Sequence, residues 1–307
     1  ILIFFENRTG NVRVSGRKRT KNKQSSRQKR SRFLLVSIMA AAGLCCSGET
    51  SGGPPDFSAM QETSQRKKAF FCYLAPMVEK ENVRLLAERS RLQKILKEQS
   101  KGHSPSSSEE DFVKSLSIEF GLPDTPLTKS VVENLLLHAD VIPVSLALAQ
   151  AANESAWGTS RFAREGNNYF GQWCFKPGCG LVPKERPKGQ TYEVRSFSST
   201  QDSVDAFMLN LNRNKPYAHF RSIRAAEQKR GRPLSGRSLA EGLKSYSARG
   251  EEYIHTLRAM IRSNKLEEFN TSSGIKQACE PSESHALRLE ENQSRVGPGM
   301  GRDLLGA

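Results

Sequence analysis

The feature that most constrains the fold is helical periodicity, which runs through most of residues 111–269 and stops in one place. Apolar residues recur at helical spacing around 129–139, in "PVSLALAQAANES" and in "SSTQDSVDAFMLNLN". Between residues 175 and 197 this spacing is lost, glycine and proline punctuate the chain, and "TYEVRSF" alternates as a strand does. The pattern predicts a mainly α domain (α+β) with one small β-hairpin.

Four further segments surround this domain. Residues 1–32 form a basic leader, and 33–46 are an apolar, signal-peptide-like run that contains three consecutive alanines. Residues 57–100 have helical periodicity, which Pro76 is expected to end or kink. Residues 270–307 are polar, glycine-rich and aperiodic, which predicts a disordered tail.

The positive charge is concentrated in the leader. The formal net charge is +15, but residues 1–32 contain eleven Lys or Arg and one acid, so the remaining chain carries about +5. A basic leader can bind nucleic acid, yet the interleaved aromatic and glycine motifs of RNA-binding modules are missing, so we expect no nucleic-acid partner. The mild remaining excess suits a polyanionic surface such as cell wall or membrane, bound peripherally. We expect an exported monomer in the periplasm or cell envelope.

One acid is placed where its chemistry would change. On a helix that starts near Pro143, Ala147, Ala151 and Glu154 fall on one face, and the small side chains let a polymer approach closely. An acid at the end of such a helix is partly desolvated, and this raises its pKa toward that of a general acid. Cleavage of a glycosidic bond requires such an acid, because the leaving oxygen must be protonated. An ordinary solvated glutamate is the alternative.

The residues around Glu154 resemble a known family. "AQAANESAWGTSRFAREGNNYFGQWC" is similar to the glucosaminidase family of peptidoglycan hydrolases, whose pattern is A-x-x-E-S-x-W-G-x-S followed by G-N-N-x-F-G. Further segments, such as "WCFKPGCG" and "SYSARGEEYI", resemble the bacterial Bax-type members of that family. The resemblance covers roughly residues 55–266 and includes every position of the double motif.

The resemblance implies a lysozyme-like helical domain with the hairpin beside a cleft, and hydrolysis of peptidoglycan glycan strands at N-acetylglucosamine. Glu154 would be the proton donor. A second catalytic group would be a hairpin glutamate, Glu193 rather than Glu185, or the substrate's own acetamido group. Tyr246 matches a tyrosine that the family places at the cleft; a core residue on a helix face is the alternative.

Several residues of the motif are candidates for binding substrate. Aromatic rings can stack on sugars or fill the core, and the two asparagines can bond substrate amides or adopt the left-handed conformation of turns. The candidates are Trp157, Asn167, Asn168, Tyr169, Phe170 and Trp173.

The cysteines indicate disulfides rather than chemistry. In an exported protein Cys174 and Cys179 are expected to form a disulfide, because Pro177 and Gly178 let the chain reverse between them. Cys72 and Cys279 can pair or stay free. The five histidines lack metal-ligand spacing, so the sequence predicts no metal or cofactor. A muramidase or lytic transglycosylase, and a non-catalytic wall-binding protein, are the rival functions.

Overall fold

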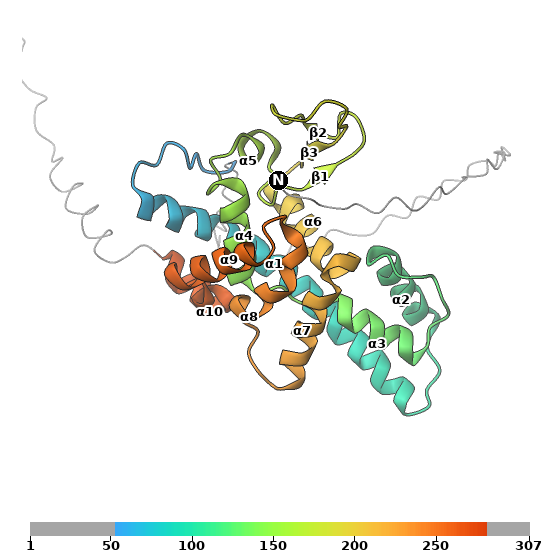
Figure 1. Ribbon diagram of the computed structural model, residues 1–307. Helices are drawn as coiled ribbons and strands as arrows, with labels where there is room; N and C mark the ends of the chain where they lie inside the picture. Colours follow the sequence, from blue (N-terminus) through green and yellow to red (C-terminus); the bar gives the residue numbers. More distant parts are fainter. Residues whose placement is uncertain (1–52, 281–307) are drawn as a thin grey trace, which may run out of the picture. The chain divides into compact units, whose positions relative to one another are not determined.

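The longest helix is α1 (Thr63–Ser100), which lies near the start of the residues that the computed structural model describes, 53–280. Its later turns lie beside α3 (Lys129–His138), and α3 in turn contacts α2 (Ser107–Glu119) (Figure 1). Pro76 lies inside the helix and does not end it, which excludes the first of the two sequence-based alternatives, an end or a kink. Buried residues continue along one face of α1 on both sides of Pro76, so core packing holds the two parts in one helix despite the lost N–H donor.

The helix α4 (Val144–Ser155) lies at the centre of the core. All its residues from Val144 to Ala152 are buried, and it packs against α1, α8 (Gly236–Leu239), α9 (Glu251–Ser263) and η3 (Leu266–Asn270). Four of those nine residues are alanines, and their small side chains allow neighbouring helices to approach on every side. The sequence-based prediction of a helix that carries Glu154 near its end is confirmed.

The other helices complete the core around α4 and α1. In α6 (Thr200–Arg213), an apolar face is buried and the Ser199 side chain accepts a hydrogen bond from the Asp202 amide, which caps the helix. The remaining helical elements are α5 (Arg161–Gly166), η1 (Lys215–Tyr217), α7 (Ala218–Lys229), η2 (Ala240–Tyr246) and α10 (Ser272–Cys279). Among residues 53–280, no helix has the length and apolar character needed to cross a bilayer.

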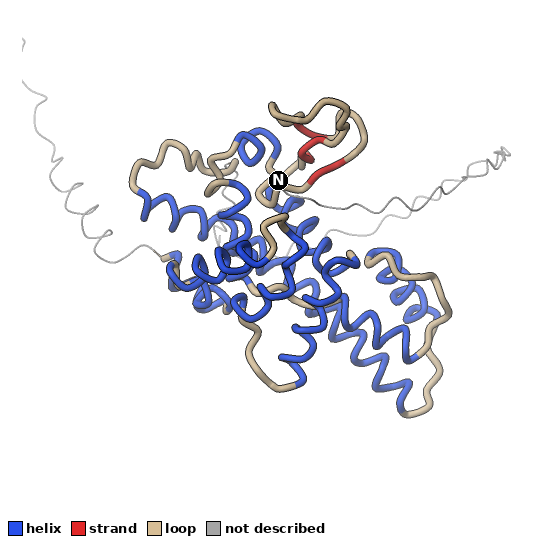
Figure 2. Tube along the Cα trace, viewed as in Figure 1, coloured by secondary structure: helices blue, strands red, loops and turns tan. Residues whose placement is uncertain are grey.

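The β structure is a three-stranded antiparallel sheet rather than a two-stranded hairpin. Its strands are β1 (Trp173–Cys174), β2 (Gly180–Leu181) and β3 (Glu193–Arg195), in the order β1-β3-β2. Trp173 and Leu181 both pair with Val194, from opposite sides. Figure 2 shows the strands gathered in one place, with long loops on either side. The mainly α class with a small β element is confirmed, and the sequence missed only the third strand.

The C-terminal part of the described chain corrects the predicted tail. Residues 272–279 form α10, which packs against α1 and η3 with Ile275 buried, so disorder does not begin at residue 270. A disulfide joins Cys72 of α1 to Cys279 of α10, which settles the pairing that the sequence left open. Because α10 has only eight residues, its own periodicity is a weak signal, and the disulfide holds it to the core. Residues 1–52 and 281–307, with the predicted leader and signal-like run, lie outside the described residues.

Candidate active site

Glu154 lies in the last turn of α4 and is half-buried. Burial raises the pKa of its carboxyl above the ordinary value of 4.5, because the charged form loses contact with water. Hydrogen bonds from the side chains of Asn153 and Tyr253, and the positive charge of Arg249, act in the opposite direction on the pKa but more weakly. The Asn153 Nδ2 donates to Oε1 of Glu154 over 3.0 Å. The environment therefore favours a protonated acid.

Three tyrosines from distant segments form a wall beside Glu154. Tyr246 and Tyr253 are stacked, with ring centroids 5.6 Å apart and planes 2° apart, and Tyr217 lies 6.0 Å from Tyr246. All three are buried, and the negative charge of Glu154 adds to burial in raising their pKa values. Their hydroxyls are therefore neutral, and their rings give the acid an apolar surround.

Two of the tyrosine hydroxyls have defined partners. The Tyr246 hydroxyl donates to the Phe170 carbonyl over 3.0 Å, so Tyr246 connects this wall to the second motif. The Tyr253 hydroxyl accepts a hydrogen bond from Gln150 Nε2 over 3.1 Å and also bonds to Glu154. The structure thus brings the predicted Tyr246 and Glu154 together. Tyr246 is at the same time a fully buried core residue.

The first motif holds the turn after Glu154. The Ser155 hydroxyl donates to the Ala151 carbonyl and accepts from the Gly158 amide, which ties the turn back onto α4. Ala156, Trp157 and Gly158 have consecutive positive φ angles of 50°, 60° and 77°. This is a strained conformation for residues other than glycine, and a Cβ on Gly158 would collide with the ring of Phe57.

Trp157 anchors this turn to α1. Its ring lies 5.4 Å from that of Phe71 and 5.9 Å from that of Phe70, and the Lys67 Nζ lies over it at 4.9 Å. Of the two alternatives for Trp157, the structure supports packing rather than sugar stacking. The turn that follows the acid is therefore fixed by side chains around it.

The second motif attaches the sheet to the helices. Asn167 has φ 50°, ends α5, and donates to the Phe197 carbonyl over 3.1 Å. Asn168 is buried, and its amide group donates to the Gln172 and Arg195 carbonyls and accepts from the Phe170 and Gln172 amides. Both asparagines are turn residues whose side chains are used within the protein.

The two aromatic residues between these turns are core residues. Tyr169 is 1% exposed, and Phe170 is fully buried and stacked on Phe207 at 4.0 Å. The structure thus shows both rings packed in the core, the alternative that the sequence left open, and sugar binding by either ring stays a prediction. Trp173 differs: it is half-buried on the sheet and stacked on Tyr192 at 4.0 Å. It is the most accessible of the predicted sugar-stacking residues in the second motif.

The Glu193 carboxylate, unlike that of Glu154, accepts hydrogen bonds from backbone amides. Its two carboxylate oxygens accept from the Gly178 amide over 3.0 Å and the Gly180 amide over 2.8 Å. These backbone donors lower its pKa below the ordinary value, because they stabilise the charged form. Cys174 and Cys179 form the expected disulfide, and it closes the loop that presents these amides. Glu185 is exposed in the long loop before β3.

Cys174, Cys179 and Glu193 also form a group of potential metal ligands, the one found among residues 53–280. Both sulfurs of Cys174 and Cys179 are consumed by the disulfide, and both oxygens of Glu193 are engaged by amides. The grouping therefore offers no ready ligand set in this state.

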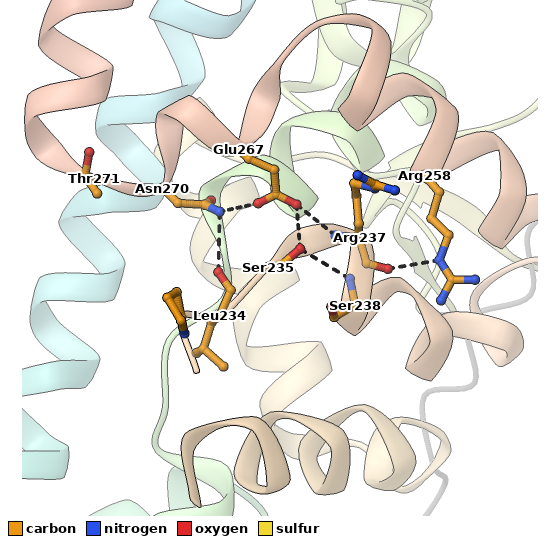
Figure 3. A pocket seen from close by; sticks show the side chains of 9 residues that line it. Leu234, Ser235, Arg237, Ser238, Arg258, Glu267, Asn270 and Thr271 are labelled. Carbon is orange, nitrogen blue, oxygen red and sulfur yellow. Dashed lines mark hydrogen bonds between the residues drawn. The ribbon is translucent and has the colours of Figure 1, made fainter. Parts of the chain in front are cut away.

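A surface hollow of about 780 Å³ lies away from Glu154 (Figure 3). Its lining includes Glu267 and Asn270, which bond to Ser145 in the first turn of α4, whereas Glu154 is in the last turn. Figure 3 shows Glu267 joined to its neighbours by several hydrogen bonds. The hollow therefore lies where the ends of several helices meet, and Glu154 is not among its lining residues.

The sequence-based reasoning missed Gln150, Tyr217 and Tyr253. Gln150 is four residues before Glu154, so helical spacing alone places both on one face. Tyr253 follows Tyr246 by seven residues, but nothing local shows that its ring faces α4. Arg249 was also missed: its guanidinium lies 5.5 Å from the Tyr253 ring centroid and 3.5 Å from Asn153 Oδ1.

Comparisons with known proteins agree with this arrangement. A family profile described as "Mannosyl-glycoprotein endo-beta-N-acetylglucosaminidase", the glucosaminidase profile, matches residues 131–266. "Protein bax" of Escherichia coli (strain K12) is 33% identical over 216 residues, which cover 70% of this chain and 76% of that protein. No solved structure matches significantly. The matched regions contain α4, the sheet and the tyrosine wall, and the chain belongs to the glucosaminidase family, in its Bax-type group.

Proposed function

We propose that the protein is a peptidoglycan hydrolase that cleaves the glycan strand at N-acetylglucosamine, with Glu154 as the general acid. The observation that carries this proposal is the half-buried carboxyl of Glu154, whose pKa is raised by burial beside three neutral tyrosines. Membership of the glucosaminidase family supports the reaction class. The double motif that encloses the acid supports the same assignment.

In this reaction Glu154 acts as a general acid that donates one proton. The carboxyl donates its proton to the glycosidic oxygen as the bond from the anomeric carbon breaks, so the leaving sugar departs as an alcohol. A raised pKa keeps that proton on the carboxyl up to a higher pH than on an ordinary glutamate. The hydrogen bond from Asn153 and the nearby charge of Arg249 then stabilise the carboxylate that remains.

The second catalytic group follows from the state of Glu193. Both oxygens of this carboxylate accept from backbone amides, which stabilise its charge and so make it a weaker nucleophile and base. The acetamido group of N-acetylglucosamine can attack the anomeric carbon itself. We therefore propose participation by the substrate and assign Glu193 to holding the sheet loop.

Export of the protein completes the proposal. The substrate lies outside the cytoplasm, and the signal-peptide-like run at 33–46 would direct the chain there. The two disulfides among residues 53–280 are typical of proteins in oxidising compartments.

The test is incubation of purified protein with cell-wall sacculi and identification of the new chain ends by mass spectrometry. We expect new reducing-end N-acetylglucosamine, and its loss in Glu154→Gln. Glu165→Gln, on the exposed side of α5, is the matched control and should retain activity. New reducing-end muramic acid would indicate a muramidase, and an anhydro end a lytic transglycosylase. A mannosyl-glycoprotein, the substrate in the family's description, is assayed in parallel. The absence of product from both the sacculi and the glycoprotein would overturn the proposal.

A further inference from the structure

The tyrosine that bonds to Glu154 is itself held by a residue of α4. Gln150 and Glu154 are four residues apart on that helix, so both side chains leave the same face, one turn apart. Tyr253 of α9 is fully buried against this face. Its hydroxyl accepts from Gln150 Nε2 over 3.1 Å, and the same hydroxyl is a hydrogen-bonding neighbour that lowers the pKa of Glu154. The three groups form a chain: Gln150, then Tyr253, then Glu154.

The direction of the hydrogen bonds in this chain is fixed by the donors available. An amide Nε2 can only donate, so the Tyr253 oxygen accepts from Gln150. A tyrosine hydroxyl has one hydrogen, and this hydrogen is left to point at Glu154. The hydrogen bond therefore favours the charged form of the Glu154 carboxyl.

Burying the polar side chain of Gln150 costs folding free energy, and core packing alone does not explain why a glutamine is present there. It is fully buried in an alanine-rich helix, and its Oε1 has no hydrogen-bond partner among the described residues. A buried polar atom without a partner destabilises the fold, and an apolar residue of the same shape would avoid this. The bond to Tyr253 is the one contact that uses the polar character of Gln150.

We propose that Tyr253, oriented by Gln150, is a positioning residue that holds the Glu154 carboxyl for proton transfer and stabilises the carboxylate as it forms. The proposal rests on the proposed role of Glu154 as the acid. When Glu154 releases its proton to the leaving oxygen, negative charge develops on the atom that Tyr253 contacts. The hydrogen bond then becomes charge-assisted and stronger, so it favours the transition state over the bound substrate.

The test compares Tyr253→Phe with the wild-type full-length protein by two measurements. The first is a carbon-13 NMR titration of the glutamate carboxyls, with the Glu154 signal assigned from its absence in Glu154→Gln. Loss of one hydrogen bond to a charged group should raise the pKa of Glu154 by about one unit. The second is turnover on sacculi, which should fall about tenfold for the same loss, with KM nearly unchanged.

A second variant separates positioning from packing. Tyr253→Phe leaves the Gln150 amide unpaired and should melt at a lower temperature than wild type. Gln150→Met combined with Tyr253→Phe removes both buried polar groups at nearly constant volume, so we expect it to regain that melting temperature. The raised pKa of Glu154 and the reduced turnover should both persist in the double variant. Recovery of either one would overturn the proposal.

Tyr73→Phe is the matched control. Its hydroxyl also bonds to a side chain, Thr200 Oγ1 at 2.9 Å, but on α1 and away from the tyrosine wall. We expect no change in the pKa of Glu154 and none in turnover. If the wild type is inactive on every substrate, the proposed function fails, while the titration still decides the contact. An unchanged Glu154 pKa in Tyr253→Phe would overturn the inference even if activity falls.

Discussion

Two glutamates lie at opposite ends of α4, one of them contributed by η3, and their surroundings are opposite. At the first turn, Glu267 of η3 accepts hydrogen bonds from the Ser235 and Ser145 hydroxyls, the Asn270 amide group and the backbone of residues 236 and 237. At the last turn, Glu154 accepts hydrogen bonds from the side chains of Asn153 and Tyr253. The helix dipole adds to this contrast, because it favours an anion at the first turn and disfavours one at the last.

The contrast separates a structural carboxylate from one suited to proton transfer. Five donors make Glu267 a clamp that joins η3 and the start of α8 to α4. Few donors and burial leave Glu154 with a raised pKa. Glu193, with a backbone amide on each oxygen, belongs with Glu267. The number of donors around an acid thus distinguishes these sites better than its position in a motif.

The largest effect is expected from Glu154→Gln. Glutamine keeps the size and the hydrogen-bonding ability but has no transferable proton, so turnover on sacculi should fall by about 10²–10⁴-fold. The melting temperature should stay the same or rise, because burial disfavours the charged form in the wild type. Turnover and thermal melting of the same preparation check this. A near-native rate would contradict the assignment of Glu154.

Glu267→Ala should have the opposite profile. It removes the acceptor from five donors, several of them partly buried, and we expect a loss of about 3 kcal/mol in unfolding free energy. Turnover per folded molecule should be nearly unchanged, because the residue lies at the other end of α4 from Glu154. Denaturant unfolding measures the free energy of unfolding, and a rate assay divided by the concentration of folded protein measures turnover. A selective loss of turnover without a loss of stability would break the comparison.

The sequence predicts one side of this comparison and not the other. Helical spacing and Pro143 place Glu154 at the end of a buried helix, and the Cys174–Cys179 disulfide follows from local turn residues. The tyrosine wall could not be predicted, because α9 meets α4, η2 meets α9 and η1 meets η2 only through tertiary packing. Glu267 has five donors from three separate segments, which no local pattern shows.

The motif residues teach a related lesson. The sequence left open whether the aromatic residues stack on sugar or fill the core, and whether the asparagines bond substrate or turn the chain. The structure uses most of these residues to hold the turn after Glu154 and the sheet. Asn168 bonds four backbone groups, and Trp157 packs on α1. A sequence motif can therefore point to a candidate site while most of its members act by supporting the backbone.

Glu193→Gln tests whether the sheet glutamate belongs with the clamp. Glutamine keeps one acceptor for an amide and loses the other, so the loop between β1 and β2 should loosen. Turnover should fall less than about tenfold, well short of the loss expected for a general acid or base. Glu185→Gln, in the exposed loop, is the control and should have no effect. A loss in Glu193→Gln as large as that in Glu154→Gln would make Glu193 the second catalytic group.

The smallest effect is a difference between Glu154→Gln and Glu193→Gln in how their stability depends on pH. The folded pKa of Glu154 lies above the ordinary value of 4.5, so its contribution to stability is fully present below about pH 4.5 and is lost as pH rises through the folded pKa. The folded pKa of Glu193 lies below 4.5, so its contribution is present above about pH 4.5 and is lost as pH falls. Relative to wild type, Glu154→Gln should therefore gain melting temperature as pH rises, and Glu193→Gln should recover it as pH falls. Melting curves from pH 3 to 8 measure both slopes, and slopes of the same sign would show that the two carboxyls are not in the opposite environments described above.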